Sequence, residues 1–258
     1  LMSSARVAEA ADSCSAAAAA ALLAWAAAEG ASVSRVTAGS SPLGGLGLFA
    51  ATDVPSGQEL LRCPLRLVLR ASMALDDPVI GGPLTALRAE LGEQVVDDRL
   101  LLRLLLLHLC AQGAGGRFWP YFEALPPRDA LVASLPSSWD AERLRVRLGG
   151  TVLEAEAERD RELLERTHAT VLRDALCTRW PAAFPPARYD LPRLRWAAAI
   201  FWSRAISLPV GSLAPLSRLH HRGGVEECLV PVLDACNHRA GSVAALAVER
   251  GAAALTAP

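Results

Sequence analysis

The segment Ser41–Arg62 has the sequence SPLGGLGLFAATDVPSGQELLR and places three glycines ahead of an apolar run, namely Gly44, Gly45 and Gly47. A dinucleotide-binding fingerprint needs a third glycine at G-x-G-x-x-G spacing and a helix after it. Here the third glycine is missing and the run at residues 47–51 predicts a strand. The spacing alone therefore favours a tight turn into a strand, in which glycines supply positive φ.

From this turn onward, the sequence predicts short strands, then a long helical block, and then strands again. A leucine-rich stretch that begins after two acidic residues and ends at Gly113 predicts a buried helix. The arginines and glutamates at 161–166 are spaced i,i+4, as on a solvated helix face. The Ala-rich C-terminal stretch fits either a hairpin that turns at Gly251 or a helix. The predicted helices cover 10–29, 99–113, much of 138–177 and 191–205, and the predicted strands cover 47–51, 59–62, 66–70 and part of 227–239.

The composition describes a globular chain and excludes some partners. The 258 residues are 52% hydrophobic and 21% charged, with a net charge of −1. Without a basic excess or a polybasic run, we expect no nucleic-acid or membrane partner. We also expect a monomer. The apolar run at 16–28 is too short to span a bilayer, and its flank is a poor signal sequence. Six scattered cysteines indicate reduced thiols, so we expect a protein that is not secreted.

The segment LVPVLDACNHR, Leu229–Arg239, gathers Asp234, Asn237 and His238 after an apolar run. The same stretch raises three alternatives. A metal site from Cys228, Cys236 and His238 lacks the usual paired spacing. A Cys236–His238 nucleophile pair is weak, because near neighbours on a strand point in different directions. The residues alone fit an Asx-type turn at a strand end best.

The stretch FWSRAISLP ends a predicted helix with Ser203 and Arg204. An arginine in an apolar helix needs a carboxylate or carbonyl partner, unless it reaches solvent from the surface. The pair His220 and His221 lies in a polar segment, where such pairs are usually solvated.

Four stretches, in this order, resemble the SET-domain protein methyltransferases, and most closely the branch typified by the Rubisco large-subunit lysine methyltransferase. They are LLAWAAAEGA, GGLGLFAATDVPSGQELLRCP, the pair FWPYFEALP and RWAAAIFWSRAISLP, and LVPVLDACNHR. The resemblance implies an α+β SET-domain fold of short β-strands and small sheets, interrupted by a large α-helical insert and incomplete at its C-terminus. The implied parts are an N-terminal helix at 1–32, N-terminal SET strands at 33–82, the helical insert at 83–191 and the start of the C-terminal SET part at 192–258.

The resemblance also implies an S-adenosylmethionine-dependent protein-lysine N-methyltransferase, a reaction that needs no metal. A protein substrate would present a lysine side chain. The implied cofactor-binding residues are Gly44, Gly45, Leu46, Arg204, Asn237 and His238, and the implied substrate-binding residues are Ser203 and Asp234.

The family's catalytic tyrosine would lie beyond the end of this chain, whose two tyrosines are Tyr121 and Tyr189. We therefore expect weak or no turnover by the chain as given, with residual cofactor affinity. There are two alternatives. One is a non-catalytic SET-like remnant that binds a protein partner, and the other is a protein-histidine methyltransferase. A chloroplast, cytoplasmic or nuclear location is compatible with the resemblance.

Overall fold

The computed structural model describes residues 4–41, 45–209, 224–237, 244–249 and 251–257, and the chain divides into two compact units. Unit 1 contains most of the strands and is formed by Leu1–Arg70, Ala114–Pro126 and Arg204–Pro258. Unit 2 is helical and is formed by Ala71–Gly113 and Pro127–Ser203. The four-part division inferred from the sequence stays a prediction.

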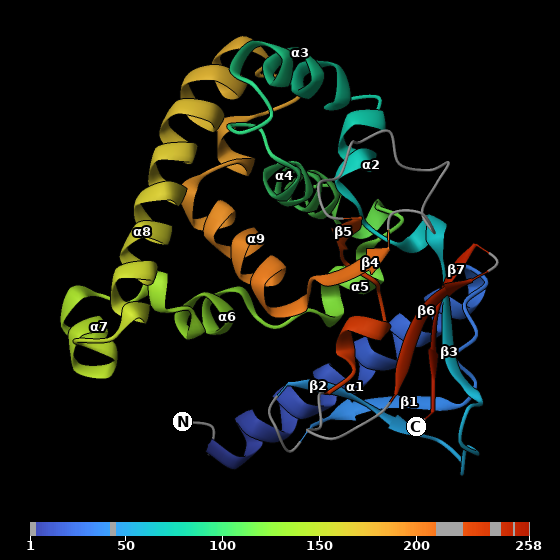
Figure 1. Ribbon diagram of the computed structural model, residues 1–258. Helices are drawn as coiled ribbons and strands as arrows, with labels where there is room; N and C mark the ends of the chain where they lie inside the picture. Colours follow the sequence, from blue (N-terminus) through green and yellow to red (C-terminus); the bar gives the residue numbers. More distant parts are fainter. Residues whose placement is uncertain (1–3, 42–44, 210–223, 238–243, 250, 258) are drawn as a thin grey trace. The chain divides into compact units, whose positions relative to one another are not determined.

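Unit 1 is built on small antiparallel sheets (Figure 1). In the sheet that continues the opening glycine turn, Gly39 of β1 faces Gly47 of β2. A second sheet places β7 between β3 and β6, so the Ala-rich C-terminal stretch forms a hairpin with Gly251 at φ +74° rather than a helix. The strands are β1 (Val36–Ser40) paired with β2 (Leu46–Ala50), β3 (Glu59–Pro64) with β7 (Ala252–Thr256) and β6 (Ala245–Glu249), and β4 (Ile206–Pro209) with β5 (Val225–Cys228).

The helix α1 (Ser4–Ala28) ends at the glycine that the sequence indicates. Gly30 takes φ +80°, its amide donates to Ala27, and the amide of Ala31 donates to Ala26, as in a Schellman motif. Near this end, Trp25 meets Phe118 edge-on at 5.8 Å between ring centroids. The short helix α5 (Trp119–Ala124) follows Phe118 and packs against α1.

The strand predicted at 66–70 is wrong. Leu65–Leu67 instead form a short 3-10 helix, in which the Val68 amide donates to the Leu65 carbonyl. Within the described part of the chain, this segment pairs through one bridge, in which Leu69 and Leu229 exchange backbone hydrogen bonds of 2.9 and 3.0 Å. Leu67, Val68 and Leu69 are buried, but so is Arg70, so the order of charged and apolar residues here marks neither a sheet nor one buried face.

Unit 2 is organised around the leucine-rich helix α4 (Asp98–Cys110). Its leucines from Leu100 to Leu107 are buried on nearly every side, which confirms the prediction of a buried helix. The other helices are α2 (Ala71–Asp76), α3 (Gly81–Leu91), α6 (Arg128–Ser134), α7 (Ala141–Leu148), α8 (Val152–Thr167), which continues as a π-helix (His168–Cys177), and α9 (Leu191–Arg204), whose last residue belongs to unit 1.

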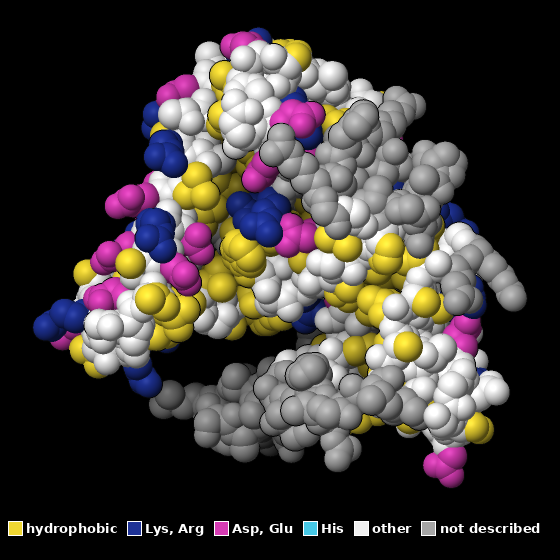
Figure 2. Space-filling model, viewed as in Figure 1, with side chains coloured by type: hydrophobic (Ala, Val, Ile, Leu, Met, Phe, Trp, Pro, Cys, Tyr) yellow, Lys and Arg dark blue, Asp and Glu magenta, His cyan; other side chains and the backbone are white. Residues whose placement is uncertain are grey.

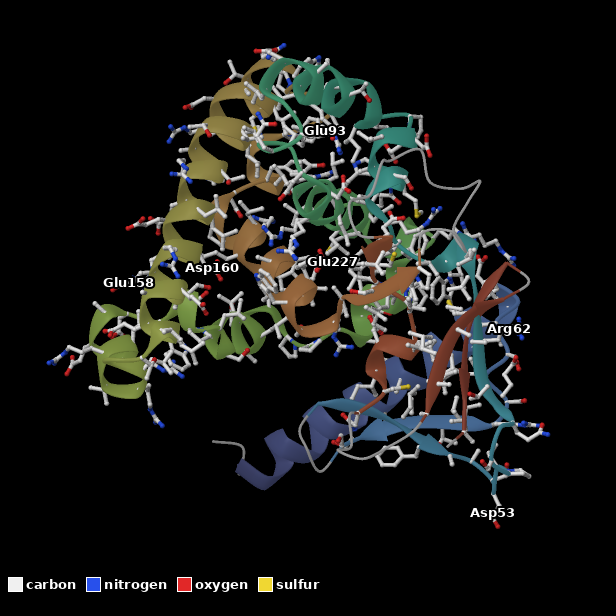
Figure 3. All side chains as sticks on the ribbon, viewed as in Figure 1. Asp53, Arg62, Glu93, Glu158, Asp160 and Glu227 are labelled. Atoms are coloured by element: carbon white, nitrogen blue, oxygen red, sulfur yellow. The ribbon has the colours of Figure 1, made fainter. Side chains whose placement is uncertain are left out.

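Charged side chains of both signs line the exposed face of α8 (Figures 2 and 3, where Glu158 and Asp160 are labelled). The charges at 161–166 do not follow the simple i,i+4 pattern. Arg161 donates to the backbone carbonyls of Ser137 and Trp139, and Glu165 pairs with Arg195 of α9 at 2.7 Å. These contacts connect α8 to residues 137–139, which precede α7, and to α9.

The N-terminus of α4 is capped by Asp97, whose Oδ1 accepts a hydrogen bond from the Leu100 amide at 2.7 Å. We expect Asp97→Ala to lower the free energy of unfolding by about 1 kcal/mol, because an amide of the first turn loses its partner. Urea unfolding measures this change. Asp97→Asn keeps a capping oxygen and is the control, expected within a few tenths of a kcal/mol of wild type; equal losses in both variants would contradict a capping role.

No helix among the described residues is long and apolar enough to cross a membrane.

Candidate functional site

The glycine turn of unit 1 lies directly against Asn237. The Asn237 amide nitrogen Nδ2 donates to Ser41 Oγ at 2.8 Å. A Cβ added at Gly47 would lie 2.5 Å from that Nδ2 and 3.0 Å from the Ser41 Cβ. Gly45 has φ +68°, and its carbonyl accepts the Ser41 amide at 2.8 Å, which closes the turn. Glycine is thus required here for close approach at Gly47 and for backbone conformation at Gly45.

A strained backbone turn presents the next candidate, Asp234. Val232, a β-branched residue, takes φ +73° and ψ −53°, close to the rare γ-turn conformation. The 3-10 helix Leu233–Ala235 follows at once and carries Asp234. Residues held in such conformations cost free energy and cluster at functional sites, so this strain marks the segment as a candidate site.

Asp234 is the centre of a buried polar cluster. Its side chain is 1% exposed, and its Oδ2 accepts a hydrogen bond from the Tyr121 hydroxyl at 2.5 Å. Arg204, at the end of α9, donates from Nη1 to the Asp234 carbonyl at 3.2 Å. The same Nη1 lies 3.8 Å from Asp234 Oδ1, so the ion pair is long. The arginine predicted to need a carboxylate or carbonyl partner has both.

Burial sets the protonation of this cluster. It raises the pKa of Asp234 from 3.8 to about 6, although Arg204 and the Tyr121 hydrogen bond act to lower it. Burial and the nearby Asp234 also raise the pKa of the Tyr121 hydroxyl well above its usual value. The thiol of Cys236 is affected in the same way, with a pKa of about 11. Cys236 is therefore a protonated thiol at neutral pH, which counts against the nucleophile alternative.

The predicted site residues have different outcomes. Asn237 meets the turn formed by Ser41 and Gly45, and Leu46 is the first residue of β2. Arg204 meets Asp234. The Ser203 hydroxyl donates to carbonyls of its own helix, Ala199 at 2.7 Å and Ile200 at 3.3 Å. Gly44 and His238 lie outside the described residues, as do His220 and His221. The assignment of these residues to cofactor and substrate stays a prediction.

Three residues of the site were not identified from the sequence. Gly47 was available as the second glycine of the G-x-G pattern, but its role depends on contact with Asn237. Ser41 carried no signal. Tyr121 is one of two tyrosines in the chain, and that scarcity was the only sign of it.

Among the described residues, no three His, Cys, Asp or Glu side chains form a group that could hold a metal ion. This finding does not test the alternative metal site, because one of its three residues, His238, lies outside the described residues.

The architecture is that of the SET-domain fold: small antiparallel sheets in one unit and a helical unit inserted along the chain. Solved structures that share it are the SET domain of LSMT bound to lysine and AdoHcy, with a TM-score of 0.70, and Rubisco LSMT bound to AdoMet, with a TM-score of 0.69. A third, Rubisco LSMT bound to sinefungin and monomethyllysine, has a TM-score of 0.67. Each is 22% identical over 93% of this chain and 49% of its own.

This chain therefore spans about half the length of the proteins whose fold it shares. No protein-family model matches the chain, and no curated protein matches it. The resemblance read from the sequence is thus confirmed at the level of the α+β SET-domain fold.

Proposed function

We propose that this chain is the SET-domain part of an S-adenosylmethionine-dependent protein-lysine N-methyltransferase. The observation that carries the proposal is the close contact between Gly47 and Asn237. A side chain at position 47 would collide with the Asn237 side-chain amide. Arg204 adds a guanidinium in the same unit. Among solved structures with this fold, one is bound to AdoMet and another to lysine and AdoHcy, which supports the proposal.

The residues fit the two polar ends of S-adenosylmethionine. The exposed Asn237 side chain offers amide hydrogen-bonding groups for the adenine end, next to the close backbone approach at Gly47. A guanidinium suits a carboxylate, and Arg204 donates one hydrogen bond to a described residue, which leaves N–H groups for the amino-acid end. When bound, the cofactor supplies a methyl group on a sulfonium.

The protein's contribution is to bind and align. Methyl transfer needs a neutral lysine amine held in line with the methyl carbon, and positioning of this kind supplies a large share of rate enhancement. We assign the Asp234 segment to the substrate side of the site, since the strained turn at Val232 fixes its direction. The assignment of Ser203 to the substrate stays a prediction, because its hydroxyl donates to a carbonyl of α9 itself.

We expect Arg204→Lys to weaken S-adenosylmethionine binding at least tenfold. Lysine keeps the positive charge beside Asp234 but loses the fork of N–H groups that matches a carboxylate. Isothermal titration calorimetry measures the affinity. Arg195→Lys is the matched control on the same helix, because Arg195 pairs with Glu165 within unit 2. Equal affinities in wild type and Arg204→Lys would contradict the assignment of Arg204.

Transfer itself is tested on a full-length version of the protein, with an isotope-labelled methyl donor, cell extract and mass spectrometry. Label on protein lysine supports the proposal, and label on histidine supports the alternative histidine activity. Cofactor binding without transfer, for any protein in the extract, would favour the non-catalytic remnant.

A further inference from the structure

Tyr121 and Asp234 are 113 residues apart in the chain, yet they form a close hydrogen bond of 2.5 Å. The Tyr121 side chain lies in α5 and is 1% exposed. A hydroxyl that donates to a buried carboxylate at this distance makes a charge-assisted bond, stronger than an ordinary neutral one. Asp234 is therefore held by its Oδ2, and its rotamer is fixed from the α5 side.

The described residues offer the other oxygen of the same carboxyl group no hydrogen bond. Asp234 Oδ1 is buried without a partner among the described residues, although Arg204 Nη1 is only 3.8 Å away. A hydrogen-bonded Arg–carboxylate pair would bring these atoms to about 2.7–2.9 Å. Arg204 instead donates to the Asp234 main-chain carbonyl at 3.2 Å. Arg204 therefore lies beside the Asp234 carboxyl group without a side-chain hydrogen bond to it.

We propose that Tyr121 is a positioning residue that holds the Asp234 carboxyl group away from the Arg204 guanidinium, so that the guanidinium stays free for the carboxylate of a ligand. Without the hydroxyl, the buried carboxylate needs another donor, and the Arg204 guanidinium is already within 3.8 Å of its Oδ1. A closed Arg204–Asp234 pair would then compete with the ligand for the same N–H groups. The identity of that ligand as S-adenosylmethionine rests on the proposed function.

The test compares Tyr121→Phe with wild type by calorimetry. We expect the affinity for S-adenosylmethionine to fall about fivefold in the variant, which loses only a hydroxyl. Adding Asp234→Asn to it should restore most of the affinity, because the competing charge is gone. General damage to the fold would not be repaired by a second substitution, so recovery separates positioning from a structural role.

Tyr189→Phe is the matched control. Tyr189 is also buried, at 2% exposed, and its hydroxyl has no hydrogen-bond partner among the described residues. It belongs to unit 2, so this variant should bind S-adenosylmethionine as wild type does. Unchanged affinity in Tyr121→Phe, or no recovery in the double variant, would overturn the proposal.

Crystal structures of the ligand-free wild type and Tyr121→Phe separate this inference from the proposed function. We expect the Oδ1–Nη1 distance to stay near 3.8 Å in wild type and to shorten to hydrogen-bond range in the variant. A shortened distance in a protein that binds no S-adenosylmethionine would retain the positioning role and reject the cofactor. An unchanged distance would reject the positioning role whatever the ligand.

Discussion

Gly47→Ala is expected to lower the affinity for S-adenosylmethionine on the order of 30-fold, or roughly 2 kcal/mol. The added Cβ would lie 2.5 Å from Asn237 Nδ2, a separation that real contacts do not adopt. Asn237 is exposed, so its amide can swing into solvent and the strand can stay paired. The hydrogen bond to Ser41 is lost in that movement. Calorimetry measures the affinity, and urea unfolding is expected to show a cost of only about 1 kcal/mol.

Gly39→Ala is the control for this experiment, because Gly39 faces Gly47 across the same pair of strands. Its added Cβ would meet only the Phe49 ring at 3.9 Å, an ordinary contact. Both variants replace glycine with alanine in the same sheet and so change the backbone entropy of the unfolded chain equally. They differ only in the atoms that the added methyl group would contact. Gly39→Ala should keep wild-type affinity and gain up to about 1 kcal/mol of stability. Matching losses of affinity in the two variants would contradict a specific role for the Gly47–Asn237 contact.

Local features of the fold were predictable because their causes are local. Gly30 ends α1 because a glycine at that point accepts positive φ and lets two amides turn back onto the last helical carbonyls. The burial of α4 followed from leucines placed around its whole circumference. The prediction at 66–70 was wrong because a strand needs a partner along its length, whereas the segment has a single bridge at Leu69, and its order of charged and apolar residues does not even follow burial, since Arg70 is buried.

The site depends on contacts between distant segments, which no short pattern encodes. Asn237 and Ser41 are 196 residues apart, so the reason for glycine at position 47 appears only when the chain is folded. The same holds for Tyr121 and Asp234. Val232 adds a different limit, since a β-branched residue is among the least expected at positive φ. The order of motifs pointed to Asp234 and Arg204, while their contact and their distance apart required the structure.

Asp234→Asn is expected to change the pH dependence of stability by about 3 kcal/mol. Burial raises the pKa of Asp234 from 3.8 to about 6, and each pKa unit corresponds to about 1.36 kcal/mol. Because the pKa is higher in the folded state, the folded protein holds this proton more tightly than the unfolded chain. The stabilising contribution of the protonated carboxyl group is therefore complete below pH 4 and is lost as the pH rises through about 6.

Asparagine resembles the protonated carboxyl group and does not titrate, so the variant should gain on wild type as the pH rises. The difference in free energy of unfolding should be smallest near pH 4 and about 3 kcal/mol larger in favour of the variant at pH 7. Urea unfolding at intervals between these values measures it. Asp174→Asn is the control, because Asp174 is exposed and its pKa is lowered by Arg173, so any trend runs the other way. A flat difference for Asp234→Asn would mean that this carboxyl group is ionised in the folded protein across the whole range, and that Arg204 and Tyr121 together outweigh its burial.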